Sequence, residues 1–136
     1  MTPTATALLG FTAWTILMLV LLAFVRTSAV MSGKRRANSF NPSGEDVEGF
    51  ARRLTRVHAN CYENLPAAAA VLLYAIATAQ TAVTDGLAYI FLGARILQSL
   101  THLASTSNPA VTVRFAFFVV QVAILLYWLL HLFGVL

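Results

Sequence analysis

The run ALLGFTAWTILMLVLLAFV, residues 7–25, contains no charged side chain and decides the fold class of the chain. At about 19 residues it is long enough to cross the hydrocarbon core of a bilayer as a helix. The preceding residues 1–6 contain no Lys or Arg, so the basic leading region of a secretory signal peptide is missing. We therefore predict a retained transmembrane helix at about residues 4–25.

The composition extends this interpretation to the whole chain. The 136 residues are 59% hydrophobic and only 10% charged, whereas a soluble domain carries roughly 25% charged residues. Lipid must therefore cover part of the surface. Three more apolar stretches predict spans at about residues 60–81, 87–103 and 109–133. The predicted fold is a single all-α membrane domain over residues 1–136, built as a four-transmembrane-helix bundle.

The basic residues predict the orientation of this bundle. Seven of the nine Lys and Arg residues lie between Arg26 and Arg56, whereas the predicted turn at residues 81–86 has none. Loops rich in Lys and Arg are retained on the cytoplasmic side. We expect a cytosolic loop at about residues 26–50, with both termini on the other side of the membrane. Because these charges lie between two apolar spans, we do not expect a nucleic-acid partner.

Three of the predicted helices carry polar residues at helical spacing. The second helix, expected from about Asp46 to Thr81, has four at spacings of 3, 4 and 3, and the third and fourth spans repeat the pattern. Such spacing places side chains on one face of a helix. Ionisable groups inside a membrane are costly and mark functional sites. The residues are Arg53, Arg56, Asn60 and Glu63 on the second helix, Arg95, Gln98 and His102 on the third, and Arg114 and Gln121 on the fourth.

The depth of these groups predicts a shared cavity. Glu63, His102 and Arg114 lie near the cytosolic ends of their spans, and Arg95 lies about 10 Å deeper at 1.5 Å per residue. We expect an arginine-rich cavity that opens to the cytosol, with Glu63 as its main acid. Such a cavity suits a small polyanionic ligand with amide groups.

Other interpretations of the same residues remain open at this point. Glu63 and Arg95 would serve equally as a buried ion pair that stabilises the bundle. Arg52 and Arg53 would serve as anchors to lipid headgroups. His58 and His102 suggest a pair of haem ligands, but neither flanks a cofactor motif, and we expect no bound metal.

Three stretches together resemble a known family. These are Arg56-Val-His-Ala-Asn60-Cys-Tyr-Glu63-Asn-Leu-Pro66, then Phe91-Leu-Gly-Ala-Arg95, and His102-Leu-Ala-Ser-Thr-Ser-Asn followed by Arg114-Phe. They are similar to the MAPEG family, the membrane-associated proteins in eicosanoid and glutathione metabolism, and to its bacterial-type microsomal glutathione transferase-like members. The resemblance covers nearly the whole chain.

The resemblance implies a homotrimer that binds glutathione between subunits at the cytosolic side. It further implies that the glutathione thiolate reacts with lipophilic electrophiles, or reduces lipid peroxides, that arrive through the membrane lipid. Arg114 would be the catalytic residue that stabilises the thiolate. His102 stands where the family often has Tyr, which speaks against a specific eicosanoid activity. The implied glutathione-binding residues are Arg35, Arg53, Arg56, Asn60, Glu63, Arg95, Gln98 and His102.

Two other functions compete with this enzyme. The first is a non-enzymatic protein of the same family that binds or presents lipids, with an unchanged fold and no activated thiolate. The second is a small four-span exporter, which needs an acid within the membrane to couple ions. The first span has no acid, and Glu63 lies near the cytosolic boundary, so we rank the exporter last.

Overall fold

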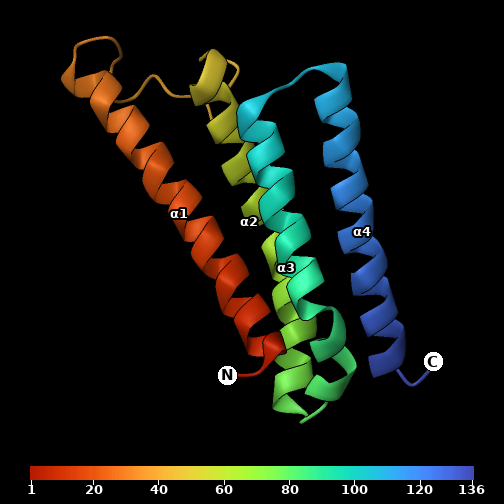
Figure 1. The fold of residues 1–136 in the computed structure, drawn as a ribbon. Coiled ribbons are helices and arrows are strands. Elements are labelled where there is room, and N and C mark those ends of the chain that lie inside the picture. The colour runs from red at the N-terminus through yellow and green to blue at the C-terminus, as the bar shows by residue number, and fades with distance from the viewer.

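Four α-helices make up the protein in the computed structural model, which describes all 136 residues. They are α1 (Pro3–Met31), α2 (Gly49–Ala77), α3 (Thr81–Ala104) and α4 (Asn108–Leu132). The helices alternate in direction, so that both termini lie at one end of the bundle (Figure 1). The α1–α2 connection and the α3–α4 turn lie at the other end. The predicted all-α bundle of four helices is therefore confirmed.

The surface of the bundle is that of an integral membrane protein. Three of the helices, α1, α3 and α4, are long and apolar enough to cross a membrane. Large apolar side chains on them face outward, where lipid rather than water suits them. Helix α2 is more polar because its first half carries the arginines. Examples of the outward-facing side chains are Leu19, Val20, Phe24, Val119 and Leu126.

Local sequence accounts for both ends of α1 and for the start of α4. At the start of α1 the Thr2 hydroxyl accepts a hydrogen bond from the Ala5 N–H, and Pro3 occupies the first helical position. Helix α1 ends at Met31, and Gly33 follows with φ +76°, in the left-handed conformation that ends many helices. Ser107 caps α4 by accepting from the Ala110 N–H.

The connection between α2 and α3 differs from the prediction. The polar turn predicted at residues 81–86 is wrong, because α2 ends at Ala77 and α3 already begins at Thr81. Asp85 thus lies within a helix, where it accepts hydrogen bonds from the Thr4 N–H (3.0 Å) and the Thr4 hydroxyl (2.5 Å). A carboxylate at the N-terminus of a helix is favourable. Asp85 therefore joins α3 to the start of α1 instead of forming a loop.

The start of α2 is also later than predicted. We expected the helix from about Asp46, but it begins at Gly49. The Asp46 side chain is instead paired with Arg35 across the α1–α2 connection. Glu48 is extended (φ −126°, ψ 168°) and Gly49 has φ +61°, so the helix starts three residues later than predicted.

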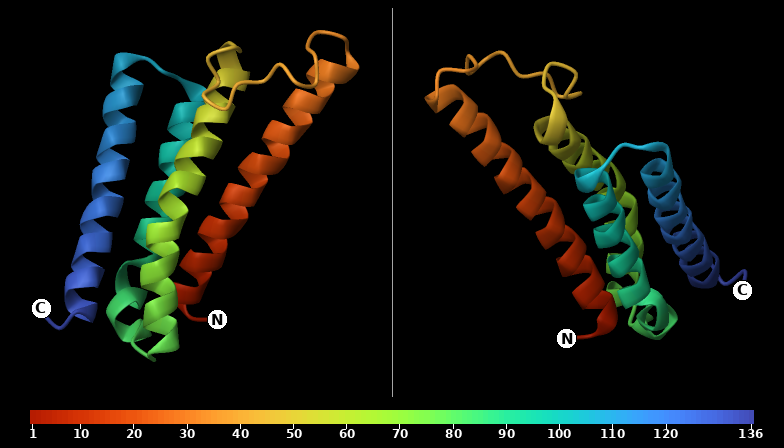
Figure 2. Two further views of the ribbon diagram at one scale, coloured as in Figure 1. Left: turned by 180° about the vertical axis from the view of Figure 1, so that it is seen from behind. Right: turned by 45° about the horizontal axis from the view of Figure 1, so that its top comes forward.

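Buried side chains from all four helices form the core of the bundle. Helix α1 contacts α2 and α3, α4 contacts mainly α3, and α1 does not contact α4. The rings of Phe11, Phe91 and Trp128 form a line through this core, with centroid distances of 6.0 and 5.4 Å. Towards the α1–α2 connection α1 diverges from the other helices (Figures 1 and 2). Phe40 and Val47 of the connection line a small space between α1 and α2 there, with α1 residues such as Leu22 and Val25.

Candidate functional site

A polar cavity of about 300 Å³ lies at the end of the bundle that carries the α1–α2 connection. The residues that line the cavity come from the first half of α2, the last turns of α3 and the first turns of α4, which all lie at this end of the bundle. The structure thus brings together five of the nine residues that the sequence proposed for the site. The lining consists of Arg56, Val57 and Asn60 of α2, Gln98, Ser99 and His102 of α3, and Arg114 of α4.

The cavity is positively charged and contains no acid. Arg56 and Arg114 contribute guanidinium groups from two different helices, and Val57 is the one hydrophobic residue of the lining. Arginine forks match carboxylates in geometry and form short, charge-assisted hydrogen bonds with them. The lining therefore suits an anion with several acceptor groups.

Arg95 lies behind the cavity wall rather than in it. Its Nη1 donates a hydrogen bond of 2.5 Å to Asn60 Oδ1, and its guanidinium lies 4.9 Å from the centroid of the Phe11 ring. The side chain is 2% exposed, and its Nε has no hydrogen-bond partner. Arg95, which the sequence placed in the lining, instead contacts the lining residue Asn60 from behind.

The buried ion pair between Glu63 and Arg95, which the sequence left open, is wrong. The only ion pair in the protein joins Arg35 to Asp46. Glu63 is exposed and does not line the cavity. At 100° per residue, the four polar residues of this predicted face, from residue 53 to residue 63, spread over about 80° of the helix circumference, and Glu63 is about 10 Å along the axis from Arg56. One face of a helix is thus too wide and too long for all its polar residues to reach a single cavity.

Gln98 is held by a residue that the site prediction left out. Gln121 Nε2 donates to Gln98 Oε1 (2.8 Å) and also to the Phe117 carbonyl oxygen (3.0 Å). Gln121 is 2% exposed and is not part of the lining. The sequence feature that pointed to Gln121 is its spacing of seven residues from Arg114, which places both residues on one face of α4.

Ser99 and Val57 also line the cavity although neither was predicted. The Ser99 hydroxyl donates to the Arg95 carbonyl oxygen (3.1 Å) and lies 3.7 Å from the sulfur of the buried Cys61. Ser99 lies four residues after Arg95, so helical spacing places it on the same face of α3 as the predicted site residues. Nothing in the sequence distinguished Val57 from other apolar residues of α2.

Arg53 and Arg52 bind backbone oxygens outside the cavity. Arg53 Nε donates to the Leu103 carbonyl oxygen (2.7 Å), one of the acceptors that the end of α3 leaves free. Arg52 donates to the carbonyl oxygens of Gly44 (3.2 Å) and Glu45 (2.9 Å). Within one chain, both arginines therefore fasten α2 to neighbouring segments.

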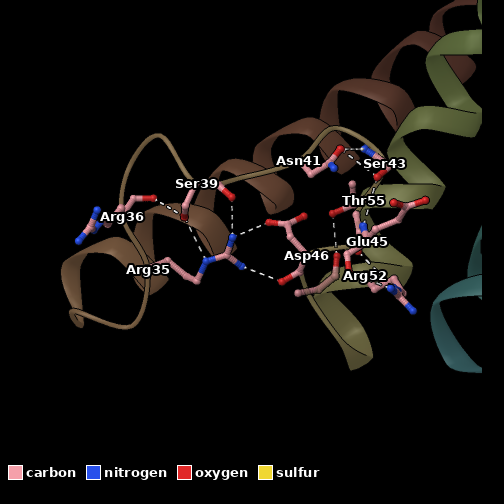
Figure 3. A network of polar contacts seen from close by, with 11 residues as sticks. Arg35, Arg36, Ser39, Asn41, Ser43, Glu45, Asp46, Arg52 and Thr55 are labelled. Atoms are coloured by element: carbon pink, nitrogen blue, oxygen red, sulfur yellow. Dashed lines mark hydrogen bonds and ion pairs between the residues drawn. The ribbon is translucent and has the colours of Figure 1, made fainter.

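Arg35 is fully occupied within the α1–α2 connection (Figure 3), and it is not part of the cavity lining. Its nitrogens donate to the side chain (3.1 Å) and carbonyl oxygen (2.7 Å) of Ser39, and to the carbonyl oxygen (3.1 Å) and carboxylate (2.5 Å) of Asp46. Its guanidinium also stacks over Phe40, at 4.7 Å from the ring centroid. The hydrogen bond from Arg35 holds the pKa of Asp46 below its ordinary value. The geometry of a single chain thus gives Arg35 a role in the loop and no contact with a ligand in the cavity.

The two histidines of α2 and α3 do not lie in one cavity. His102 lines the cavity, whereas His58 packs against Tyr62 in a tilted arrangement, at a centroid distance of 5.1 Å, and is not part of the lining. No group of three or more His, Cys, Asp or Glu side chains is placed to hold a metal ion. His102 is therefore available for hydrogen bonding in the cavity.

Comparison with known proteins identifies the family. Neither the curated proteins nor the solved structures give a match to this chain. The model of the MAPEG family matches residues 4–134, which is nearly the whole sequence and all four helices. The chain therefore belongs to the MAPEG family, the membrane-associated proteins in eicosanoid and glutathione metabolism.

Proposed function

We propose that this protein is a glutathione transferase or peroxidase, which activates the glutathione thiol for reaction with lipophilic electrophiles or lipid peroxides. The observation that supports it is the cavity in which Arg56 and Arg114 lie together with two amide side chains and no acid. Membership in the MAPEG family supports the choice of glutathione among small anions.

Glutathione matches this cavity in chemistry and in scale. It carries two carboxylates, one amine and two peptide groups, and hence a net negative charge near neutral pH. Its acceptors match the donors of Arg56, Asn60 and Gln98. Ligand sites commonly measure about 300–1,000 Å³, and the cavity of about 300 Å³ is at the lower end of this range.

Arg114 is the proposed catalytic residue. A cysteine thiol has a reference pKa of about 8.5 and is mostly protonated at pH 7. A fixed cation close to the sulfur lowers the pKa of such a thiol by roughly 1–3, which raises the fraction of the nucleophilic thiolate. Arginine keeps its charge even where it is partly buried. Arg114 is half-buried at the start of α4 and suits this role.

Both reactions then follow from one thiolate. In conjugation the sulfur forms a bond to an electrophilic carbon, and the leaving group departs with its electron pair. In peroxide reduction the sulfur attacks one peroxide oxygen and the alkoxide leaves, taking a proton to become the alcohol. A second glutathione then converts the sulfenic acid to glutathione disulfide and water. Holding the two reactants side by side supplies much of the acceleration.

A homotrimer with the cavity open to the cytosol completes the proposal. The outer face of α2 presents Glu63 beside exposed aromatic and aliphatic side chains, among them Tyr62, Leu73 and Tyr74. A neighbouring subunit on this face would bring Glu63 within reach of a shared ligand. Lipophilic substrates would approach from the membrane between the helices.

The protein purified in lipid nanodiscs tests this function. We expect calorimetry to show glutathione binding, and we expect turnover of a generic aromatic halide in its presence. Without glutathione binding, the proposal fails. Binding without turnover, and without the ultraviolet band of the thiolate, would instead favour the non-enzymatic alternative.

One observation favours that alternative, a protein that binds lipids. An apolar groove of about 280 Å³ lies between α2 and α4, near the chain termini. All of its lining residues are hydrophobic, and an acyl chain would fit them. The residues are Ala70, Val71, Tyr74, Leu129, Leu132 and Phe133. Binding of a labelled fatty acid that is unaffected by glutathione, together with absent turnover, would support this function.

A further inference from the structure

We propose that Gln121 is a positioning residue that fixes the direction of the Gln98 amide, so that the cavity offers hydrogen-bond donors to a carboxylate of the ligand. This inference rests on the proposed function and specifies which chemical group of glutathione this wall of the cavity recognises. Gln121 itself lies behind the wall and does not touch the ligand.

The backbone of α4 determines how the two glutamines are oriented. The Phe117 carbonyl oxygen can only accept, so the Gln121 atom that lies 3.0 Å from it must be the nitrogen Nε2. The same nitrogen lies 2.8 Å from the Gln98 side chain and donates to it, which makes the Gln98 atom the oxygen Oε1. The chemistry therefore excludes a flipped Gln98, and the Nε2 of Gln98 is the atom left for the cavity.

Asn60, which lines the cavity from α2, is oriented in the same sense. Arginine has donors and no acceptor, so the Asn60 atom that lies 2.5 Å from Arg95 Nη1 must be the oxygen Oδ1. The Asn60 side-chain nitrogen makes no hydrogen bond within the chain and is left for the cavity. Two buried side chains, Arg95 and Gln121, thus direct two amides so that both present N–H groups.

These two amides share the lining with Arg56 and Arg114, which are also donors. A carboxylate has only acceptor atoms and accepts from several donors at once. An amine or ammonium group would find acceptors mainly in the Ser99 hydroxyl and the His102 ring, whereas Arg56, Asn60, Gln98 and Arg114 all present donors. The lining therefore favours a carboxylate end of glutathione over its ammonium end.

A set of three variants tests whether Gln121 acts through Gln98. We measure the Kd of glutathione by calorimetry for Gln98→Met, Gln121→Met and the double variant, with Ile124→Met as a control on the same side of α4. Each single variant should weaken binding by about threefold to tenfold, the range of a single hydrogen bond. The double variant should be no weaker than Gln98→Met alone, because without Gln98 there is nothing left for Gln121 to orient.

Thermal unfolding of each variant separates this effect from a structural one. A residue that only stabilises the bundle would lower the melting temperature and would weaken binding equally in the presence and absence of Gln98. If the two losses multiply in the double variant, Gln121 does not act through Gln98 and the inference is wrong.

Gln98→Glu tests the polarity even if Gln121→Met fails to fold. This change keeps the shape and keeps an oxygen for Gln121, but it replaces the cavity-facing nitrogen with an oxygen. We expect glutathione binding to weaken more than tenfold. Unchanged affinity would overturn the inference, whereas a wild-type protein that does not bind glutathione would overturn the proposed function and this inference with it.

Discussion

Arg95 holds Asn60 from behind the cavity wall, through a hydrogen bond of 2.5 Å from its Nη1 to Asn60 Oδ1. The guanidinium is 2% exposed and pairs with no carboxylate in the chain. A buried charge without a partner is costly. An anion in the neighbouring cavity would offset part of that cost, which links the stability of this charge to ligand binding.

Replacing Arg95 tests this link. We expect Arg95→Met to weaken glutathione binding by about tenfold, because a hydrogen bond to a charged group contributes about 1.5–3 kcal/mol and Asn60 loses its orientation. The melting temperature without ligand should change little, since the buried charge that is removed had no ion-pair partner. Arg95→Lys serves as the control that keeps the charge. Unchanged affinity in Arg95→Met would remove Arg95 from the site.

Glu63 is a predicted site residue that is exposed and does not line the cavity of its own chain. Because it is exposed, we expect Glu63→Gln to change the free energy of unfolding by less than about 0.5 kcal/mol. Glutathione binding should nevertheless weaken if a neighbouring subunit brings Glu63 to the ligand. Calorimetry on the variant, with Glu48→Gln of the loop as a matched control, measures this. Equal affinity for Glu63→Gln and wild type would exclude Glu63 from the site.

The sequence predicted the helices and most of the cavity lining for physical reasons. The lipid environment requires long apolar helices, so the spans are visible as runs of apolar residues. Polar residues inside such runs are rare, and Arg56, Asn60, Gln98, His102 and Arg114 stood out for that reason. Their spacing and their depth were enough to place them at one end of the bundle.

The sequence could not predict how the other basic residues are used. Arg35 and Arg53 bind groups of the chain itself, Asp46 and the Leu103 carbonyl oxygen, and such partners depend on the path of a loop and the end of a helix. Helical spacing also does not distinguish the cavity wall from the layer behind it. For that reason Arg95 was placed in the lining and Gln121 was left out of the site.

The clamp between Arg35 and Asp46 should respond to acid. The pKa of Asp46 is lowered by the hydrogen bond from Arg35, so the clamp is complete above about pH 4, the pKa of a free Asp. It is lost as the pH falls through the lowered pKa of the folded protein. Hydrogen exchange should therefore show a protected α1–α2 connection at pH 7 that opens towards pH 2. Asp46→Asn should be open at both pH values, and Glu48→Gln should behave as wild type.

If the connection in Asp46→Asn exchanges as slowly as in wild type at pH 7, the ion pair does not order this loop. Contacts of Phe40 with Arg26 and Arg35 would then be the alternative cause, since both guanidinium groups lie within 5.2 Å of its ring centroid.

We expect Asp85 to contribute to the stability of the bundle and not to ligand binding. It accepts two hydrogen bonds from Thr4 at the end of the bundle far from the cavity. We expect Asp85→Ala to lower the free energy of unfolding by about 1–3 kcal/mol, with unchanged affinity for glutathione. Asp85→Asn keeps an acceptor oxygen and should lose less. A loss of affinity equal to that of a cavity variant would contradict the separation of the two ends.

Arg114, as the cation that stabilises the glutathione thiolate, is the residue on which the proposed activity depends most. The most direct measurement is the ultraviolet difference spectrum of glutathione added to the wild-type protein and to Arg114→Ala, at a concentration that saturates both. We predict a thiolate band at pH 7 in the wild type, its loss in Arg114→Ala, and a fall in turnover of about a hundredfold or more, as for the removal of other groups that stabilise developing charge. A thiolate band of equal intensity in both proteins would contradict the account.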